Sequence, residues 1–341
     1  SRQQLFPQSE FFGTDWSKLD TNITTNATTS PEGLQNATKV ETATGGSSSN
    51  INDIIYKAAN TDYTFSVFAK AGSVNRVIVG QQMTGIYSNN IFDFSTGNWE
   101  VTGSGSPTLD KQDLGNGWWR LSVTMNSGAS SANYQCWIGP IDNDGTTSND
   151  TTAGNNIYVF GAQLEAGSYV SSYIPNHGTS GGVTRAADTC LGGGSAESIN
   201  SVEGVLYAEI AALADDEINR HITLWDGTDT NRLVLKYDNQ SNVVQVFNRV
   251  GGIETAFLGH SLADITILHK IAVRYKANDY ALVIDGVQVD TDTSSSTWSV
   301  SVFNDVKFSN GSGSDFYGNV KQLAVFNEAL SDSELATLTT L

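Results

Sequence analysis

The segment YTFSVFAKAG, residues 63–72, alternates aromatic or aliphatic residues with small or polar residues. A period of two is typical of a β-strand that places one face in a hydrophobic core. The alternation recurs in WRLSVTM (119–125), IYVF (157–160), VLYAEI (205–210) and RLVLKY (232–237). Clusters of Gly, Asn, Asp and Ser separate these runs, as in two-sheet sandwiches. The sequence therefore predicts an all-β fold made of β-sandwiches.

The chain length and one glycine-rich segment predict two domains in tandem. The 341 residues suggest about two domains, at roughly 100–200 residues each. Gly192-Gly193-Gly194-Ser195 is typical of a flexible linker. We therefore expect a first domain over 1–189, a Gly-rich linker over 190–199 and a second domain over 200–341.

Local signals mark a few further elements. Asp285-Gly286, between YALVI and VQV, predicts a two-residue type I′ hairpin turn. Ser331-Asp332-Ser333-Glu334 is a capping box and predicts one short C-terminal helix. The Thr-, Asn- and Ser-rich region 9–50 is expected to form loops, with short edge strands around 38–42. Cys136 is expected to lie buried in a strand, and its pairing with Cys190 is left open.

The charge balance limits the classes of partner. Lys and Arg number 18 and Asp and Glu number 36, so the formal net charge is 18 − 36 = −18. Nucleic-acid binding needs clustered Lys and Arg to displace the phosphate counterions, and the sequence contains no basic stripe, so we expect no nucleic-acid partner. No run approaches the roughly 18 apolar residues of a membrane-spanning helix, so no membrane insertion is expected.

Two pairs of segments resemble known families. DLGNGWWRLSVT (113–124) with VFGAQLEAGSYVSSYIPNHGTSGGVTRAAD (159–188) resembles a carbohydrate-binding-module-like jelly roll of bacteriophage tail fibres and head spikes. HKIAVRYKANDYALVIDGVQVDTDTS (269–294) with FYGNVKQLAVFNEALSDSELATLTTL (316–341) resembles a laminin-G or concanavalin-A-like lectin sandwich. The first resemblance covers most of 10–188 and the second about 200–341, so the resemblance implies two jelly-roll sandwiches.

The resemblance implies a viral spike or tail-fibre component on the virion surface, which binds a host cell-surface polysaccharide and contacts other virion proteins. Homo-oligomer formation is left open, because phage fibres often form trimers but no heptad repeat is present. A polysaccharide depolymerase or lyase and a purely structural virion decoration protein are the alternatives. We expect no enzyme activity. The Glu-x-Asp-x-x-Glu strand of similar glucanases is absent, and YKANDY (275–280) is only superficially similar to a lyase motif.

Aromatic residues beside polar turns are the candidate glycan-binding residues. Sugar rings bind to aromatic faces, and nearby polar groups bind their hydroxyls. Tyr87 and Trp99 lie in turn-rich sequence, Trp225 adjoins the Asp226 turn, and Trp298 follows the polar segment DTDTSSST. Burial in the core is the alternative for each of them.

Two acidic segments are candidate calcium sites, because calcium is bound by about 6–8 oxygen atoms. Asp142, Asp144 and Asp150 lie in DNDGTTSND, and Asp226 and Asp229 lie in DGTDTN. The alternatives are a long polar loop and an ordinary hairpin turn, respectively.

Overall fold

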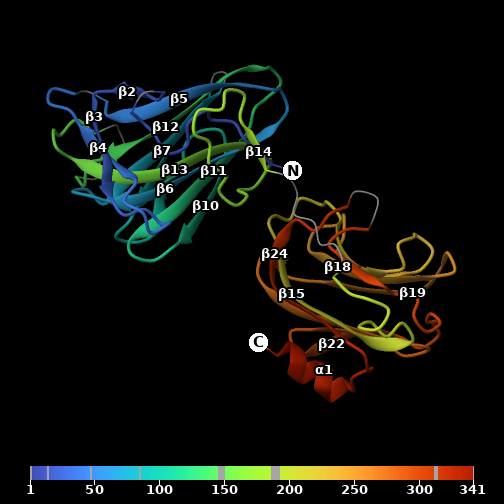
Figure 1. The fold of residues 1–341 in the computed structure, drawn as a ribbon. Coiled ribbons are helices and arrows are strands. Elements are labelled where there is room, and N and C mark those ends of the chain that lie inside the picture. Colours follow the sequence, from blue (N-terminus) through green and yellow to red (C-terminus); the bar gives the residue numbers. More distant parts are fainter. Residues whose placement is uncertain are drawn as a thin grey trace. The chain divides into compact units, whose positions relative to one another are not determined.

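The structure is a computed structural model that describes residues 2–13, 15–46, 48–83, 86–144, 150–185, 193–310 and 314–340. The chain divides into two compact units, Ser1–Ala187 and Asp188–Leu341 (Figure 1). Each unit contains two large antiparallel sheets of five or six strands, so the predicted all-β fold of two sandwiches is confirmed. Among the described residues, no helix is long and apolar enough to cross a membrane.

Unit 1 has two six-stranded sheets. The first has the order β10 (Thr108–Asp113), β11 (Trp118–Asn126), β6 (Asp62–Ala71), β13 (Asn156–Ala166), β4 (Ala37–Thr42) and β3 (Thr21–Thr28). The second has the order β2 (Ser17–Leu19), β5 (Asn50–Lys57), β12 (Ala132–Ile141), β7 (Arg76–Met83), β8 (Ile86–Asp93) and β9 (Asn98–Val101). The short strands β1 (Arg2–Gln4) and β14 (Val183–Arg185) pair with each other.

The core of unit 1 lies between these sheets. Phe65, Val67 and Ala69 of β6 are fully buried in it, as the alternation in 63–70 predicts. Cys136 is also buried there and has a free thiol, whereas Cys190 lies outside the described residues. The loops expected over 9–50 are partly wrong, because residues 21–28 form the eight-residue strand β3, which pairs with β4. Pairing with β4 supplies the backbone hydrogen bonds that a loop would leave to water.

The segment that follows β13 folds back over the outer side of that strand. Gln163 and Glu165 point out of the core, yet both are fully buried. Gln163 Oε1 accepts a hydrogen bond from the Ile174 backbone N–H at 2.6 Å, and a Glu165 oxygen accepts one from the Ser171 N–H at 3.0 Å. Within GAQLEAGSYVSSYIPN (161–176), two side chains of β13 therefore bind the backbone of the segment that follows the strand.

Unit 2 has two five-stranded sheets. The first has the order β22 (Val287–Asp292), β21 (Tyr280–Ile284), β20 (His269–Lys276), β15 (Glu203–Ala212) and β24 (Gly318–Phe326). The second has the order β19 (Ile253–Ser261), β18 (Val243–Val250), β17 (Arg232–Tyr237), β16 (Arg220–Trp225) and β23 (Asp305–Lys307). Asp285 and Gly286, with φ of 50° and 84°, form the predicted turn between β21 and β22.

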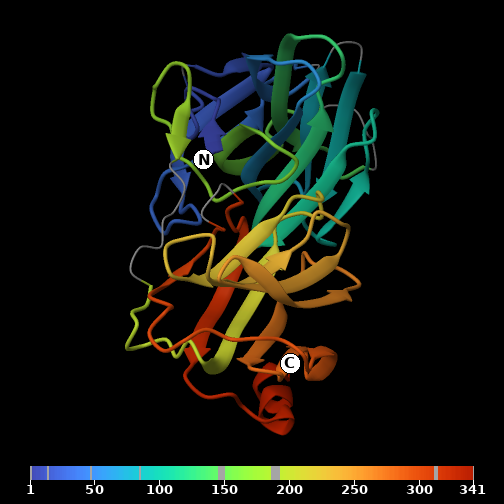
Figure 2. The same cartoon turned by 90° about the vertical axis from the view of Figure 1, so that its right-hand side faces the viewer.

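The predicted C-terminal helix is α1 (Asp332–Thr339), the red helix at the bottom of Figure 2. Ser331 and Glu334 form its capping box, and Leu335 is buried against the first sheet of unit 2. Arg274 of β20 fixes the start of the helix, since its guanidinium donates to Asp332 at 2.6 Å and to the Leu330 carbonyl at 3.1 Å.

The end of the predicted linker belongs to unit 2. Ile199 is buried in the unit 2 core, and its N–H donates to the Ser195 carbonyl at 3.0 Å. The Gly193 N–H donates to Asp305 at 3.1 Å. Residues 193–199 are thus held by local hydrogen bonds and core packing, and residues 190–192 lie outside the described part of the chain.

Candidate functional site

The outer side of the second sheet of unit 1 gathers aromatic rings and carboxamides. We call this surface the amide–aromatic face. It is defined by the outward side chains of Asn52, Ile54, Tyr56, Gln82, Tyr87, Asn89, Asn133, Gln135 and Trp137. They come from the four adjacent strands β5, β12, β7 and β8.

Strand register brings these residues together. Residues that pair across antiparallel strands lie on the same side of a sheet. Tyr56 pairs with Asn133. Ile54, Gln135, Gln82 and Tyr87 form one continuous row across the four strands. A second row consists of Asn52, Trp137, Gly80 and Asn89.

Alternate residues of the same strands form the other side of the sheet. Tyr134, Cys136 and Ile138 of β12 are buried in the unit 1 core, as are Val77 and Val79 of β7. Because successive strand residues point to opposite sides, Gln135 and Trp137 must point away from that core. The pleat therefore fixes the orientation of the amide–aromatic face.

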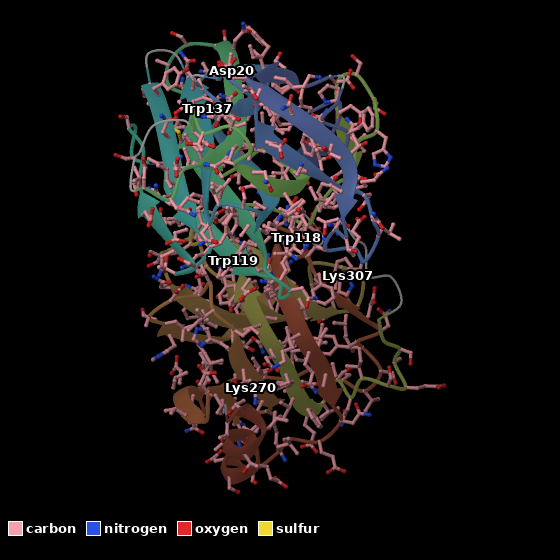
Figure 3. The ribbon with its side chains drawn as sticks, turned by 90° about the vertical axis from the view of Figure 1, so that its left-hand side faces the viewer. Asp20, Trp118, Trp119, Trp137, Lys270 and Lys307 are labelled. Atoms are coloured by element: carbon pink, nitrogen blue, oxygen red, sulfur yellow. The ribbon has the colours of Figure 1, made fainter. Side chains whose placement is uncertain are left out.

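Two tyrosines project from this face, whereas its tryptophan is part of the support. The exposed fractions are 71% for Tyr56, 57% for Tyr87 and 4% for Trp137. The Tyr87 and Trp137 ring centroids lie 5.1 Å apart with a 43° interplanar angle. Trp137, labelled in Figure 3, also packs with Ile78 and Ile91. Tyr87 is thus an exposed ring held against a buried one, as an aromatic binding platform requires.

The polar groups of the face are carboxamides. Gln135 Nε2 donates to Asn52 Oδ1 at 3.0 Å, and Asn52 Nδ2 donates to Asn50 Oδ1 at 3.1 Å. Within the described part of the chain, the buried Oδ1 atom of Asn89 has no hydrogen-bond partner. A carboxamide both donates and accepts hydrogen bonds, as does a sugar hydroxyl. The chemistry of the face therefore suits a ligand rich in hydroxyl groups.

Only one of the four predicted glycan-binding residues belongs to this face. Tyr87 is exposed as expected, although it lies in strand β8 and not in a turn. Trp99 lies in β9 and is half-buried, with its ring centroid 5.4 Å from that of Phe92 at the edge of the core. Its expected position in an exposed turn is therefore wrong.

The exposure expected for Trp225 and Trp298 is also wrong. Trp298 is 4% exposed, and its Nε1 donates to the Arg249 carbonyl at 2.6 Å, while its ring packs against Phe303. Trp225 is 8% exposed, with the Lys307 ammonium 3.9 Å from its ring centroid. A polar neighbouring sequence does not show where a large side chain points. Burial of the large apolar surface of an indole is favourable, and both rings are buried here.

The candidate calcium ligands accept hydrogen bonds from their own loops. Asp226 Oδ1 accepts from the Thr228 N–H at 2.8 Å and its Oδ2 from Asn231 at 2.8 Å, while Asp229 pairs with Arg232 at 2.8 Å. Burial alone would raise the pKa of Asp226, but the hydrogen bonds from Thr228 and Asn231 hold that pKa below its usual value. These two aspartates form a hairpin turn whose carboxylates already have protein partners, and calcium binding by them stays a prediction.

The structure describes only part of the other acidic segment, residues 142–150. Asp142 Oδ2 accepts from Thr152 at 2.7 Å, and the buried Asp150 accepts from Thr42 at 2.7 Å. Asp144 is described, but residues 145–149 lie outside the described part of the chain. Among the described residues, no three His, Cys, Asp or Glu side chains gather as a metal site. Calcium binding by Asp142, Asp144 and Asp150 therefore stays a prediction.

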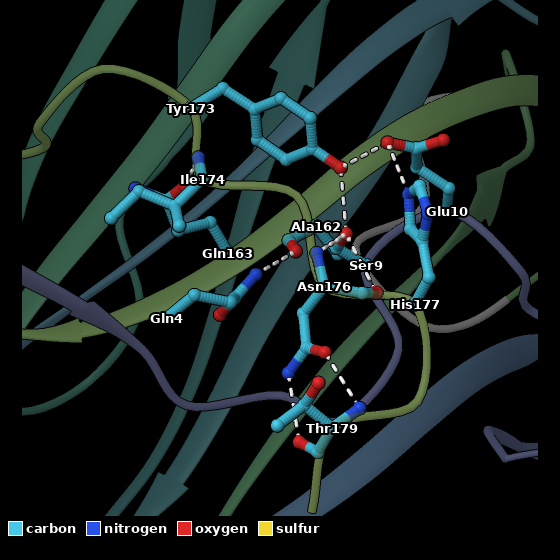
Figure 4. Close-up of polar contacts among 10 residues, drawn as sticks. All are labelled: Gln4, Ser9, Glu10, Ala162, Gln163, Tyr173, Ile174, Asn176, His177 and Thr179. Carbon is cyan, nitrogen blue, oxygen red and sulfur yellow. Dashed lines mark hydrogen bonds and ion pairs between the residues drawn. The ribbon is translucent and has the colours of Figure 1, made fainter. Parts of the chain in front are cut away.

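A cluster of Ser, Glu, His and Tyr near the N-terminus resembles catalytic chemistry only in composition (Figure 4). Ser9 is fully buried, and its hydroxyl contacts Tyr173 at 2.7 Å and not the exposed His177. His177 instead lies 3.2 Å from Glu10. Among the described residues no base contacts the Ser9 hydroxyl, so this arrangement holds the N-terminal segment in place and does not activate a nucleophile.

Comparisons with known proteins identify similar β-sandwiches. No protein-family model matches the chain, and no curated protein sequence matches it. The CBM40 module of the Ruminococcus gnavus IT-sialidase matches with a TM-score of 0.35 and 18% identity, over 41% of this chain and 83% of that chain. Mouse laminin α1 domains LG4-5 match with a TM-score of 0.31 and 10% identity, over 82% of this chain and 88% of that chain. The chain is thus similar to carbohydrate-binding-module and laminin-G sandwiches.

Proposed function

We propose that this chain is a non-catalytic carbohydrate-binding protein and that the amide–aromatic face is its binding surface. The observation that carries the proposal is the exposed Tyr87 ring, held beside Trp137 in a row of carboxamides. An aromatic ring covers the apolar side of a sugar, and amides bind its hydroxyls. The sequence resemblance supports the finer proposal of a phage spike or tail-fibre component that binds a host surface polysaccharide.

The proposed binding is weak at each site. An open sheet face buries less ligand surface than a pocket, so we expect dissociation constants from about millimolar to micromolar, or about −4 to −8 kcal/mol. Many copies on one particle would raise the avidity by roughly 10²–10⁴ over a single site. Attachment through a multivalent virion surface is consistent with this proposal.

A glycan-array screen of the intact chain, with Tyr87→Ala and Phe257→Ala, tests the binding. Phe257 is a matched control because it lies in unit 2 and is 55% exposed, against 57% for Tyr87. We expect Tyr87→Ala to weaken binding about tenfold, or about 1.4 kcal/mol, and Phe257→Ala to bind like the parent. Equal binding by the parent and Tyr87→Ala would remove the amide–aromatic face from the proposal.

Product analysis tests the non-catalytic part of the proposal. We expect any bound polysaccharide to keep its length during prolonged incubation with the chain. Shortening of the polysaccharide would instead support the depolymerase alternative. Mass spectrometry of purified phage particles tests the virion location, and a chain found only in infected-cell lysate would contradict it.

A further inference from the structure

We infer that the amide–aromatic face selects neutral glycans, meaning polysaccharides without carboxylate, sulfate or phosphate groups. This inference rests on the proposed function of the same face and adds the class of ligand.

The face itself carries no charged side chain among the nine residues that define it. The two charged residues of β5, Asp53 and Lys57, point to the opposite side of the sheet, since they alternate with Asn52, Ile54 and Tyr56. Lys57 is fully buried and donates to the Ser127 and Ser130 carbonyls. Neither residue can therefore present its charge to a ligand on the amide–aromatic face.

Arg76 on the outer side of the sheet is remote from the face and paired. Arg76 lies four residues before Gly80 on β7, about 13 Å away at 3.3 Å per residue. Its guanidinium is only 8% exposed and pairs with Glu100 at 2.7 Å. That distance exceeds the Debye length of about 8 Å at physiological salt, so Arg76 offers little attraction to an anion at Tyr87.

An acidic glycan would lack a counter-charge on this surface. A carboxylate or sulfate that loses water on binding needs a cation or several donors to replace that water. Arginine forks and lysine ammonium groups usually fill this role. Here the groups available are amides and two phenols, and the chain as a whole carries a formal charge of −18. Both the local chemistry and the long-range field therefore disfavour a polyanion.

The extent of the face favours an oligosaccharide over a single sugar. Tyr56 on β5 and Tyr87 on β8 are three inter-strand steps and two residues of register apart, or about 16 Å at roughly 4.8 Å per step and 3.3 Å per residue. Gln135 and Gln82 lie between these tyrosines, and Ile54, which is 50% exposed, lies beside Tyr56 on β5. A sugar chain that crosses the strands would contact an aromatic ring near each end and amides between them.

The test is affinity electrophoresis of the intact chain in gels that contain one soluble polysaccharide each. Dextran, galactomannan and xyloglucan are the neutral probes, and alginate and dextran sulfate are the acidic probes. Each gel compares the parent with Tyr87→Ala, Tyr56→Ala and the control Phe257→Ala, at about 50 mM and 500 mM salt. We expect retardation by at least one neutral probe, unchanged by salt and reduced about tenfold in apparent affinity by Tyr87→Ala.

The outcomes separate the inference from the function on which it rests. Tyr87-dependent retardation confined to alginate or dextran sulfate, and lost at high salt, would overturn the neutral class and leave carbohydrate binding intact. Retardation that Tyr87→Ala and Tyr56→Ala leave unchanged would overturn the inference and place carbohydrate binding on another surface. No retardation by any probe would overturn both the inference and the proposed function. Near-ultraviolet circular dichroism of each variant confirms that the fold is retained.

Discussion

A Cβ atom on Gly80 would lie 1.9 Å from the indole ring of Trp137, because the two residues pair directly across β7 and β12. The ring therefore lies against the backbone of β7 at Gly80, in space that the side chain of any other residue would fill. Trp137 in turn contacts Tyr87. The backbone of one strand, a buried indole and an exposed phenol thus form a stack that positions the binding surface.

Gly80→Ala should disturb this stack. The added methyl group must displace the indole, and overpacking of this kind costs about 1–3 kcal/mol. We expect a lower Tm and weaker glycan binding in the same variant. Gly259→Ala is the control, because its nearest neighbour would lie 3.8 Å from the new Cβ. Thermal melts measure the Tm of both variants. A Gly80→Ala protein as stable as the parent would contradict the proposed stack.

Asp53→Asn should stabilise the protein at neutral pH. Burial raises the pKa of Asp53 to about 6, the Ile54 N–H opposes that rise, and Asp15 adds to it. A carboxyl group with a raised folded pKa contributes stability at low pH, and this contribution is lost as pH rises through about 6. At pH 8 the asparagine avoids the buried charge, and we expect a gain of about 1 kcal/mol after discounting for partial exposure.

Melts from pH 4 to pH 8 measure the Asp53 effect. The Tm difference between Asp53→Asn and the parent should grow as pH rises through 6 and reach about 2–4 °C. Because Asp53 alternates with Asn52 and Ile54 but points to the other side of the sheet, glycan binding should not change at pH 4. A pH-independent difference would show that Asp53 does not titrate in this range.

The sequence predicts the strands well because each alternation is local. Residues 63–70 show both the period of β6 and its buried side, and Ser331 to Glu334 show the start of α1. The same alternation holds in β12, where Tyr134 and Cys136 point inward and Gln135 and Trp137 point outward. The sequence predicts the burial of Cys136, but it does not indicate that the outward residues form a surface.

The candidate site needed information that no local pattern contains. Trp137 meets Asn52 and Gly80 through the register of three strands, and residues 52 and 137 are far apart in the chain. Tyr87 could be proposed from its polar surroundings, but the same rule selected Trp298, which the core encloses. Local polarity thus identifies turns, whereas cross-strand pairing decides which aromatic rings reach the surface.

Asn176→Ala should destabilise unit 1 through the segment that covers β13. Asn176 is 1% exposed, and its side chain donates to the Phe6 carbonyl at 2.8 Å. Its Oδ1 accepts from the Thr179 N–H at 2.9 Å (Figure 4). Alanine leaves these buried backbone groups unpaired, at a cost of about 1–3 kcal/mol for each buried group. We expect a clear fall in Tm, with the exposed Asn319→Ala unchanged as the control. Equal melting of the two variants would show that the N-terminal segment is not held by Asn176.

Calcium, if it binds, should act through the segment of Asp142, Asp144 and Asp150. The turn of Asp226 and Asp229 already uses its carboxylates for Thr228, Asn231 and Arg232. A ligand at about 100 times its dissociation constant adds roughly 2.7 kcal/mol to the stability of the folded protein. We therefore expect the Tm to rise by several degrees when millimolar calcium replaces a chelator.

Two variants locate the calcium effect. Asp142→Asn should abolish the calcium-dependent shift in Tm, because an amide is a weaker ligand than a carboxylate for a hard cation. Asp226→Asn should keep the shift, although its own Tm is lower in both buffers through the loss of charge-assisted hydrogen bonds. Magnesium at the same concentration controls for general ionic effects. An identical Tm of the parent in chelator and in calcium would contradict calcium binding. A Tm shift that is lost only in Asp226→Asn would place the calcium site in unit 2.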